Sequence, residues 1–174
     1  TTYARLARRV TAAMRELRSR VDPRAKGALV ALTPRPTEEA IVPLLACIEL
    51  GVPFVALHPR APEAERQRLL ERVRPTWIVP SDEAFGASCA PEPVPPIDPE
   101  TPLAVLFTSG TSGTPKPVVL SRRAFLASAD ASAERLPIGP GDGWLLALPP
   151  AHVGGLSVVT RSLVARSTVV LAGE

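Results

Sequence analysis

Residues 27–57 have the sequence GALVALTPRPTEEAIVPLLACIELGVPFVAL, and this stretch decides the fold. Its two ends, residues 27–33 and 52–57, are short apolar runs of the kind that form buried strands. Between them, Thr37 and the two glutamates after it are typical of a helix start, and Gly51 stands where a left-handed residue ends a helix. The stretch therefore predicts a strand, a helix and a second strand, which is the repeating unit of a parallel α/β sheet.

The alternation continues on both sides of this stretch. Apolar residues three or four apart, from Leu6 to Val21, predict a helix that ends near Arg20 and has arginines on its other faces. Further strands are expected at residues 76–79, 103–107, 118–120, 144–148 and 168–171, and further helices at 62–74, 121–135 and 153–165. We therefore expect an α/β fold with a mostly parallel sheet and flanking helices.

Length and composition set the domain organisation. The chain has 174 residues, enough for one compact domain or two small subdomains, and its 21 prolines gather only around residues 91–102. We expect a first α/β segment at residues 1–90, a Pro-rich linker at 91–102 and a second α/β segment at 103–174.

Composition also argues against several classes of protein. No apolar run reaches the roughly 18 to 20 residues that a membrane-spanning helix needs, and the start resembles no signal peptide, so we expect a cytoplasmic protein. Cys47 and Cys89 lie far apart and near no histidine, which gives no zinc spacing. The net charge of +3 comes largely from arginines in the first helix, where no aromatic residue stands among them to stack on a base, and we expect no nucleic-acid partner.

Residues 108–116, TSGTSGTPK, carry the chemistry. Two glycines let the backbone approach a ligand closely, the hydroxyls can donate to oxygens, and Lys116 adds a positive charge, a combination that suits polyphosphate. A plain surface turn can also be rich in such residues. A Walker loop is disfavoured because Pro115 and Pro117 flank the lysine and a strand is expected where a helix should begin, and the dinucleotide-binding glycine pattern is absent.

This loop resembles the phosphate loop of the adenylate-forming superfamily, which contains acyl-CoA synthetases, luciferases and the adenylation domains of peptide synthetases. Residues 2–7 (TYARLA), 46–59 (ACIELGVPFVALHP) and 148–156 (LPPAHVGGL) are similar to segments of the N-terminal domain of that superfamily, in matching order. Within it, residues 148–163 look most like the 2-succinylbenzoate:CoA ligases of menaquinone biosynthesis. The resemblance implies a partial N-terminal domain of an adenylate-forming enzyme.

The resemblance further implies that ATP activates a carboxylic acid as an acyl-adenylate, which then acylates coenzyme A. Lys116 would be a catalytic residue that offsets charge on the β- and γ-phosphates, and Thr111 would contribute to the Mg²⁺ site. Pro117 stands where the family has glycine, so one backbone donor is missing there. The implied ATP-binding residues are Thr108, Ser109, Gly110, Thr111, Ser112, Gly113, Thr114 and Lys116.

The same resemblance implies an acyl pocket in which His152 is catalytic and binds substrate beside Val153, with Gly154 and Gly155 leaving room for the acyl group. Arg161 is a candidate for contacting a second carboxylate of the acid. A lone histidine is as readily structural, and Arg161 is as readily a surface arginine. His58 is interpreted as structural.

Later elements of the family are absent from the sequence, including its magnesium-binding acid and its mobile C-terminal domain. We expect the chain to be part of a larger domain that is inactive alone, with the remainder of its own polypeptide as a partner, and a homodimer is allowed. Three alternatives stay open: another aryl- or acyl-CoA ligase, an amino-acid adenylation domain, and a non-catalytic nucleotide-binding remnant.

Overall fold

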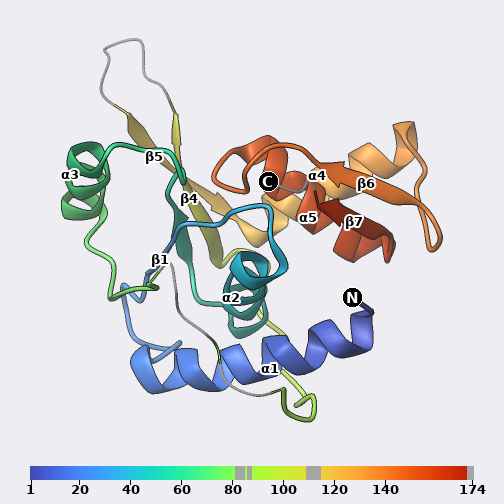
Figure 1. Cartoon of the computed structure of the whole chain (residues 1–174), viewed down its shortest axis with the longest axis horizontal. Helices are drawn as coiled ribbons and strands as arrows, with labels where there is room; N and C mark the ends of the chain where they lie inside the picture. The colour runs from blue at the N-terminus through green and yellow to red at the C-terminus, as the bar shows by residue number, and fades with distance from the viewer. Residues whose placement is uncertain (81–84, 86–87, 109–114, 172–174) are drawn as a thin grey trace.

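The structure, a computed structural model, describes residues 1–80, 85, 88–108 and 115–171. Within these residues the main sheet has five strands in the order β3-β1-β2-β4-β5, of which the first four are parallel and β5 runs antiparallel to β4 (Figure 1). A second sheet pairs two parallel strands, β6 and β7. The bounds are β1 Val30–Leu32, β2 Phe54–Ala56, β3 Trp77–Ile78, β4 Pro102–Thr108, β5 Lys116–Ser121, β6 Gly143–Leu146 and β7 Thr168–Leu171.

Five helices are described: α1 Tyr3–Arg20, α2 Glu38–Leu50, α3 Glu63–Val73, α4 Arg122–Arg135 and α5 Val153–Ala165. The predicted α/β fold with a mostly parallel sheet is confirmed. The strands differ from expectation mainly in length. Only three residues of the predicted seven-residue strand at 27–33 form β1, because only these three are paired with residues of β2 or β3. Strand β5 is longer than expected because it pairs with β4 along nearly its whole length.

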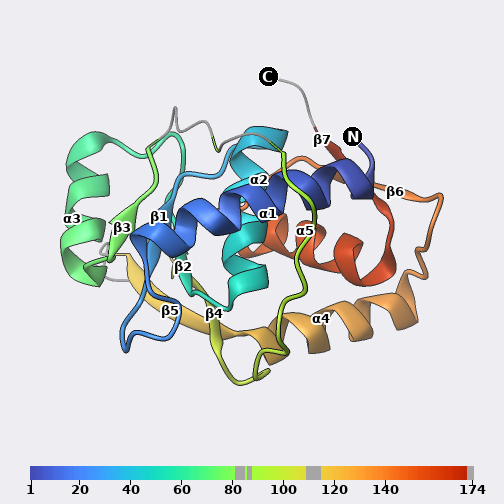
Figure 2. The same ribbon diagram turned by 90° about the horizontal axis from the view of Figure 1, so that it is seen from below.

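The sheet is covered by helices on both faces, and β1 shows how the sequence arranges this. Val30 and Leu32 belong to the large core that includes α1 and α2, whereas Ala31 belongs to a second cluster with Leu69 of α3. Alternate side chains of a strand point to opposite faces of the sheet. Because both faces are covered by helices, all three residues of β1 are buried. Figure 2 shows α1 lying across α2.

Helix α2 forms as its sequence predicts. The side chain of Thr37 accepts a hydrogen bond from the backbone N–H of Ala40 at 3.3 Å, and Gly51 ends the helix with a left-handed φ of 68°. A side chain at Gly51 would also approach Ile97 to 3.0 Å, so the position needs glycine on two grounds.

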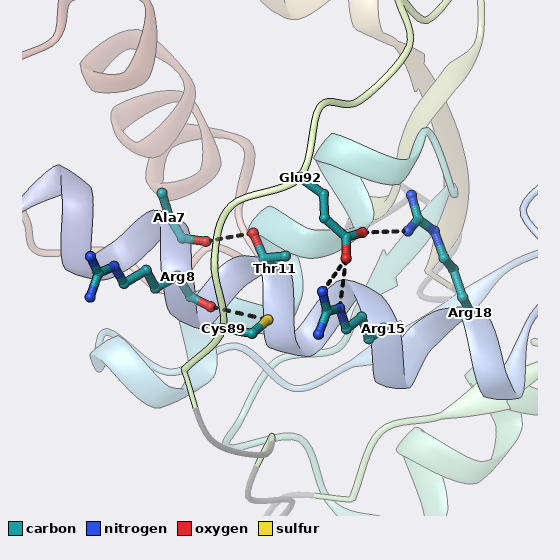
Figure 3. Close-up of polar contacts among 7 residues, drawn as sticks. All are labelled: Ala7, Arg8, Thr11, Arg15, Arg18, Cys89 and Glu92. Carbon is teal, nitrogen blue, oxygen red and sulfur yellow. Dashed lines mark hydrogen bonds and ion pairs between the residues drawn. The ribbon is translucent and has the colours of Figure 1, made fainter.

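Residues 88–97, which we call the crossing segment, lie against α1 (Figure 3). The backbone N–H of Cys89 donates to the carbonyl of Arg8 at 3.3 Å, and the carboxylate of Glu92 pairs with Arg15 and, at 3.2 Å, with Arg18. The expected linker therefore has its own contacts with the first helix. The division of the chain at residues 91–102 stays a prediction.

Candidate functional site

The carboxyl ends of the parallel strands meet at one edge of the main sheet, where ligands bind in open α/β sheets. Phe54 of β2 is level with Ala104 of β4, and Val55 with Val105. Strand β2 ends at Ala56, and His58 follows two residues later at this carboxyl end of the strand. Thr108 pairs with Lys116 across the antiparallel strands β4 and β5. One edge thus collects a histidine and both ends of the predicted phosphate loop.

Thr108 and Lys116 frame that loop. The hydroxyl of Thr108 donates to the backbone carbonyl of Lys116 at 3.4 Å, and both residues are exposed. The remaining predicted ATP-binding residues, and with them the predicted Mg²⁺ position Thr111, lie outside the described residues: Ser109, Gly110, Thr111, Ser112, Gly113 and Thr114.

Arg72 of α3 reaches this loop, and the sequence analysis missed it. Its guanidinium donates to the carbonyl of Pro115 at 3.1 Å, one residue before the lysine. The only sequence signal was a basic residue in the last turn of a helix. Such residues are common there, because a positive charge interacts favourably with the dipole at the end of the helix. Pro117 lies in β5, an edge strand, where a residue without a backbone N–H is tolerated.

His152 is placed at the start of α5 with an exposed side chain. It is the N-cap residue of that helix, but its side chain makes no capping hydrogen bond. Its ring lies 5.1 Å from the ring of His58, centroid to centroid, with the two planes tilted by 60°. Val153 is also exposed. The structure therefore brings the candidate acyl-pocket residue to the edge of the sheet where β2 ends.

His58 is the second side chain that the sequence analysis did not count as part of the site. The backbone N–H of Arg60 donates to its Nδ1 at 3.1 Å. Partial burial lowers the pKa of His58, the positive charge that His152 and Arg60 can carry lowers it further, and Glu65 opposes the shift. A histidine directly after a buried strand of a parallel sheet is the signal that could have identified it.

The two glycines after His152 have different roles. A Cβ on Gly155 would lie 2.4 Å from the carbonyl oxygens of both Leu148 and Pro149, so this buried glycine is required by the backbone that precedes the helix. A Cβ on exposed Gly154 would meet only the Leu148 side chain, at 3.2 Å. Room for an acyl group stays a prediction for both positions.

The structure does not bring Arg161 to His152. Nine residues along α5 correspond to about 13 Å of helix. The guanidinium of Arg161 instead donates to the hydroxyl of Ser128 in α4 at 3.2 Å and lies 5.6 Å from the ring centre of Trp144 in β6. Its Nε is buried and has no hydrogen-bond partner among the described residues. A substrate contact by Arg161 stays a prediction, and these contacts give the residue a structural role as well.

Four arginines of α1 form ion pairs with acids: Arg9 with Glu38, Arg20 with Glu16, and Arg15 and Arg18 with Glu92. In the part of the chain that is described, no cluster of three histidine, cysteine, aspartate or glutamate side chains could hold a metal ion. No helix in that part has the length and apolar character needed to cross a membrane.

The chain is similar in sequence to known enzymes. The model of the AMP-binding enzyme family matches residues 79–174. The chain is 30% identical over 152 residues to the 2-succinylbenzoate–CoA ligase of Bacillus licheniformis, covering 76% of this chain and 32% of the relative. It is 52% identical over 66 residues to the probable 2-succinylbenzoate–CoA ligase of Mycobacterium tuberculosis, covering 38% of this chain and 17% of the relative.

A solved structure shares the fold over the whole chain. It is the o-succinylbenzoate coenzyme A synthetase of Bacillus subtilis in complex with ATP and magnesium ion, with 26% identity and a TM-score of 0.78 over 99% of this chain and 51% of that one. The chain spans about a third, or less, of the length of the curated relatives described above.

Proposed function

Because the chain belongs to the family of AMP-binding enzymes, we propose that the polypeptide that carries it joins a carboxylic acid to coenzyme A at the expense of ATP. The observation that carries this proposal is the pairing of Thr108 with Lys116 at the edge of the sheet where β2 ends, two residues before His58. Both ends of the predicted phosphate loop and the candidate acyl-pocket histidine thereby lie at one edge.

The reaction has two steps. In the first, a carboxylate oxygen of the acid bonds to the α-phosphorus of ATP, the bond from that phosphorus to the bridging oxygen breaks, and pyrophosphate leaves. In the second, the thiol of coenzyme A attacks the carbonyl carbon of the acyl-adenylate and AMP leaves. Neither step needs a protein nucleophile, so the protein contributes chiefly by positioning the reactants and stabilising charge.

Lys116 is proposed to stabilise the charge that develops on the departing pyrophosphate, since it is an exposed cation at the end of the loop. His152 is proposed to line the entrance for the acid. The relative from Bacillus subtilis binds ATP and a magnesium ion, and a magnesium ion bound to the phosphates would neutralise further charge here. In this chain the residue proposed to contact it is Thr111.

We propose 2-succinylbenzoate as the acid, because the names of two relatives and of the Bacillus subtilis structure contain this substrate. The alternatives are other aryl or fatty acids and amino acids. One relative, 41% identical over 105 residues, is a fatty acid–[acyl-carrier-protein] ligase of Streptomyces coeruleorubidus, so fatty acids belong in the test.

Acid-dependent exchange of labelled pyrophosphate into ATP tests the proposal. The whole polypeptide is assayed with 2-succinylbenzoate, benzoates, fatty acids and amino acids. We expect exchange with 2-succinylbenzoate, and we expect Lys116→Ala to lower kcat/KM for ATP by about 100-fold or more, the usual cost of removing one charge-stabilising group. Lys26→Ala removes the other lysine of the chain, which is exposed, and serves as the matched control. Absence of exchange with every acid would overturn the proposal.

A further inference from the structure

The chain has two histidines, and the fold brings both to one place. His58 follows β2 and His152 precedes α5, so they are 94 positions apart in sequence, yet their ring centres are 5.1 Å apart. The planes are tilted by 60°, so the two rings are not stacked in parallel. The proposed reaction assigns no chemical role to His58.

The hydrogen bond from the backbone of Arg60 fixes the proton on the ring of His58. Because Nδ1 accepts that N–H at 3.1 Å, the neutral ring carries its own proton on Nε2. Protonation would place a hydrogen on Nδ1 and break this bond. Partial burial acts in the same direction and lowers the pKa of His58. The charged or titratable side chains that act on His58 are His152 and Arg60, which disfavour its cation, and Glu65, which favours it.

His152 is in a different position. Its side chain is exposed and does not cap α5. The two rings are close enough for the ring of His58 to limit where the ring of His152 can lie.

From this geometry we infer that His58 is a positioning residue for His152: its ring, held by the hydrogen bond from Arg60, fixes the place of the His152 ring at the entrance proposed for the acid. The inference rests on the proposed function, because it assigns His58 a part in binding the acid. It predicts that loss of the His58 ring weakens binding of the acid and leaves binding of ATP unchanged.

A double-mutant cycle in the whole polypeptide tests this. His58→Asn removes the ring but keeps an oxygen that can accept the Arg60 N–H, as asparagine does in turns. We expect it to raise KM for the acid by roughly two- to tenfold, the scale of coupled neighbouring side chains, with KM for ATP changed less than about twofold. Adding His58→Asn to His152→Gln is expected to change KM for the acid no further, because His58 acts through His152.

A second measurement does not depend on activity. Exchange of the imidazole C2 hydrogen, followed by mass spectrometry of peptides across a pH series, reports the pKa of His58. We expect this pKa to rise in His152→Gln, because the substitution removes a neighbouring positive charge.

The outcomes separate the inference from the proposed function. If acids are activated but the two substitutions multiply their effects on KM, or if the pKa of His58 is the same in His152→Gln, His58 does not act through His152 and the inference is wrong. If the wild-type polypeptide activates no acid, the proposed function fails, and with it the role assigned to His58.

Discussion

Among the glycines that the structure describes, Gly155 is the one at which a single methyl group is expected to cost most. A Cβ there would lie 2.4 Å from two backbone carbonyl oxygens, and backbone cannot move aside as a side chain can. We expect Gly155→Ala to lower the free energy of unfolding by about 3 kcal/mol, at the upper end of overpacking costs. Denaturation with urea measures the change.

Gly154→Ala is the matched control for this prediction. The new methyl group would meet only the movable side chain of Leu148, and alanine is favoured over glycine inside a helix by up to about 1 kcal/mol. We expect a change within about 1 kcal/mol in either direction. Equal destabilisation by both substitutions would show that the approach of Leu148 and Pro149 to the helix is not what requires Gly155.

At the scale of elements, α2 depends on its N-cap. The side chain of Thr37 satisfies the backbone N–H of Ala40, which has no partner within the helix. Thr37→Ala is expected to lower the free energy of unfolding by about 1 kcal/mol, and Thr37→Ser to leave it nearly unchanged because serine keeps the acceptor. Thermal or urea denaturation of the two variants compares them directly, and an equal loss in both would contradict the capping role.

Helix α2 also shows what could be predicted from sequence and what could not. Its two ends follow from local signals, a capping threonine and a left-handed glycine, and both were predicted to the residue. The phosphate-loop sequence was recognisable for the same reason, since it is continuous. The contact of His58 with His152 was not predictable in this way, because it depends on strand register across the sheet and on the path of the chain into α5.

The backbone role of Gly155 was not predicted, for a related reason. The structure shows that Gly155 makes room for the backbone of residues 148 and 149. The room for an acyl group that the resemblance implies at Gly154 and Gly155 stays a prediction. Similarly, the Pro-rich stretch at residues 91–102 was expected to be a linker, and its ion pairs with α1 are made by Glu92. Contacts of this kind leave no periodic pattern in the sequence.

At the scale of the whole molecule, the crossing segment contacts the first helix and leads into β4, the strand that ends at Thr108. Hydrogen bonds from Arg15 hold the pKa of Glu92 below its usual value, and Arg18 adds to this. Glu92→Gln removes the charge that both arginines contact. We expect the segment to separate from α1 more often, which raises the rate at which iodoacetamide alkylates Cys89 by roughly two- to fivefold, the scale of exposed ion pairs.

Cys47 is an internal reference for that measurement. It is fully buried in α2, and burial raises the pKa of its thiol, so it should not react in the folded protein. Glu71→Gln changes an exposed acid of α3 and is the matched control. Alkylation of Cys89 at the wild-type rate in Glu92→Gln would show that the ion pairs do not hold the crossing segment in place.

The central claim is that the polypeptide activates a carboxylate by attack on the α-phosphorus of ATP. The most direct measurement supplies 2-succinylbenzoate with ¹⁸O in its carboxylates, together with ATP and coenzyme A, and determines by mass spectrometry where the label is found. We predict one ¹⁸O in each AMP formed and none in pyrophosphate, since the oxygen that bonds to phosphorus stays with AMP when the thiol attacks the carbonyl. Formation of ADP with label in inorganic phosphate, or of AMP without label, would contradict the claim.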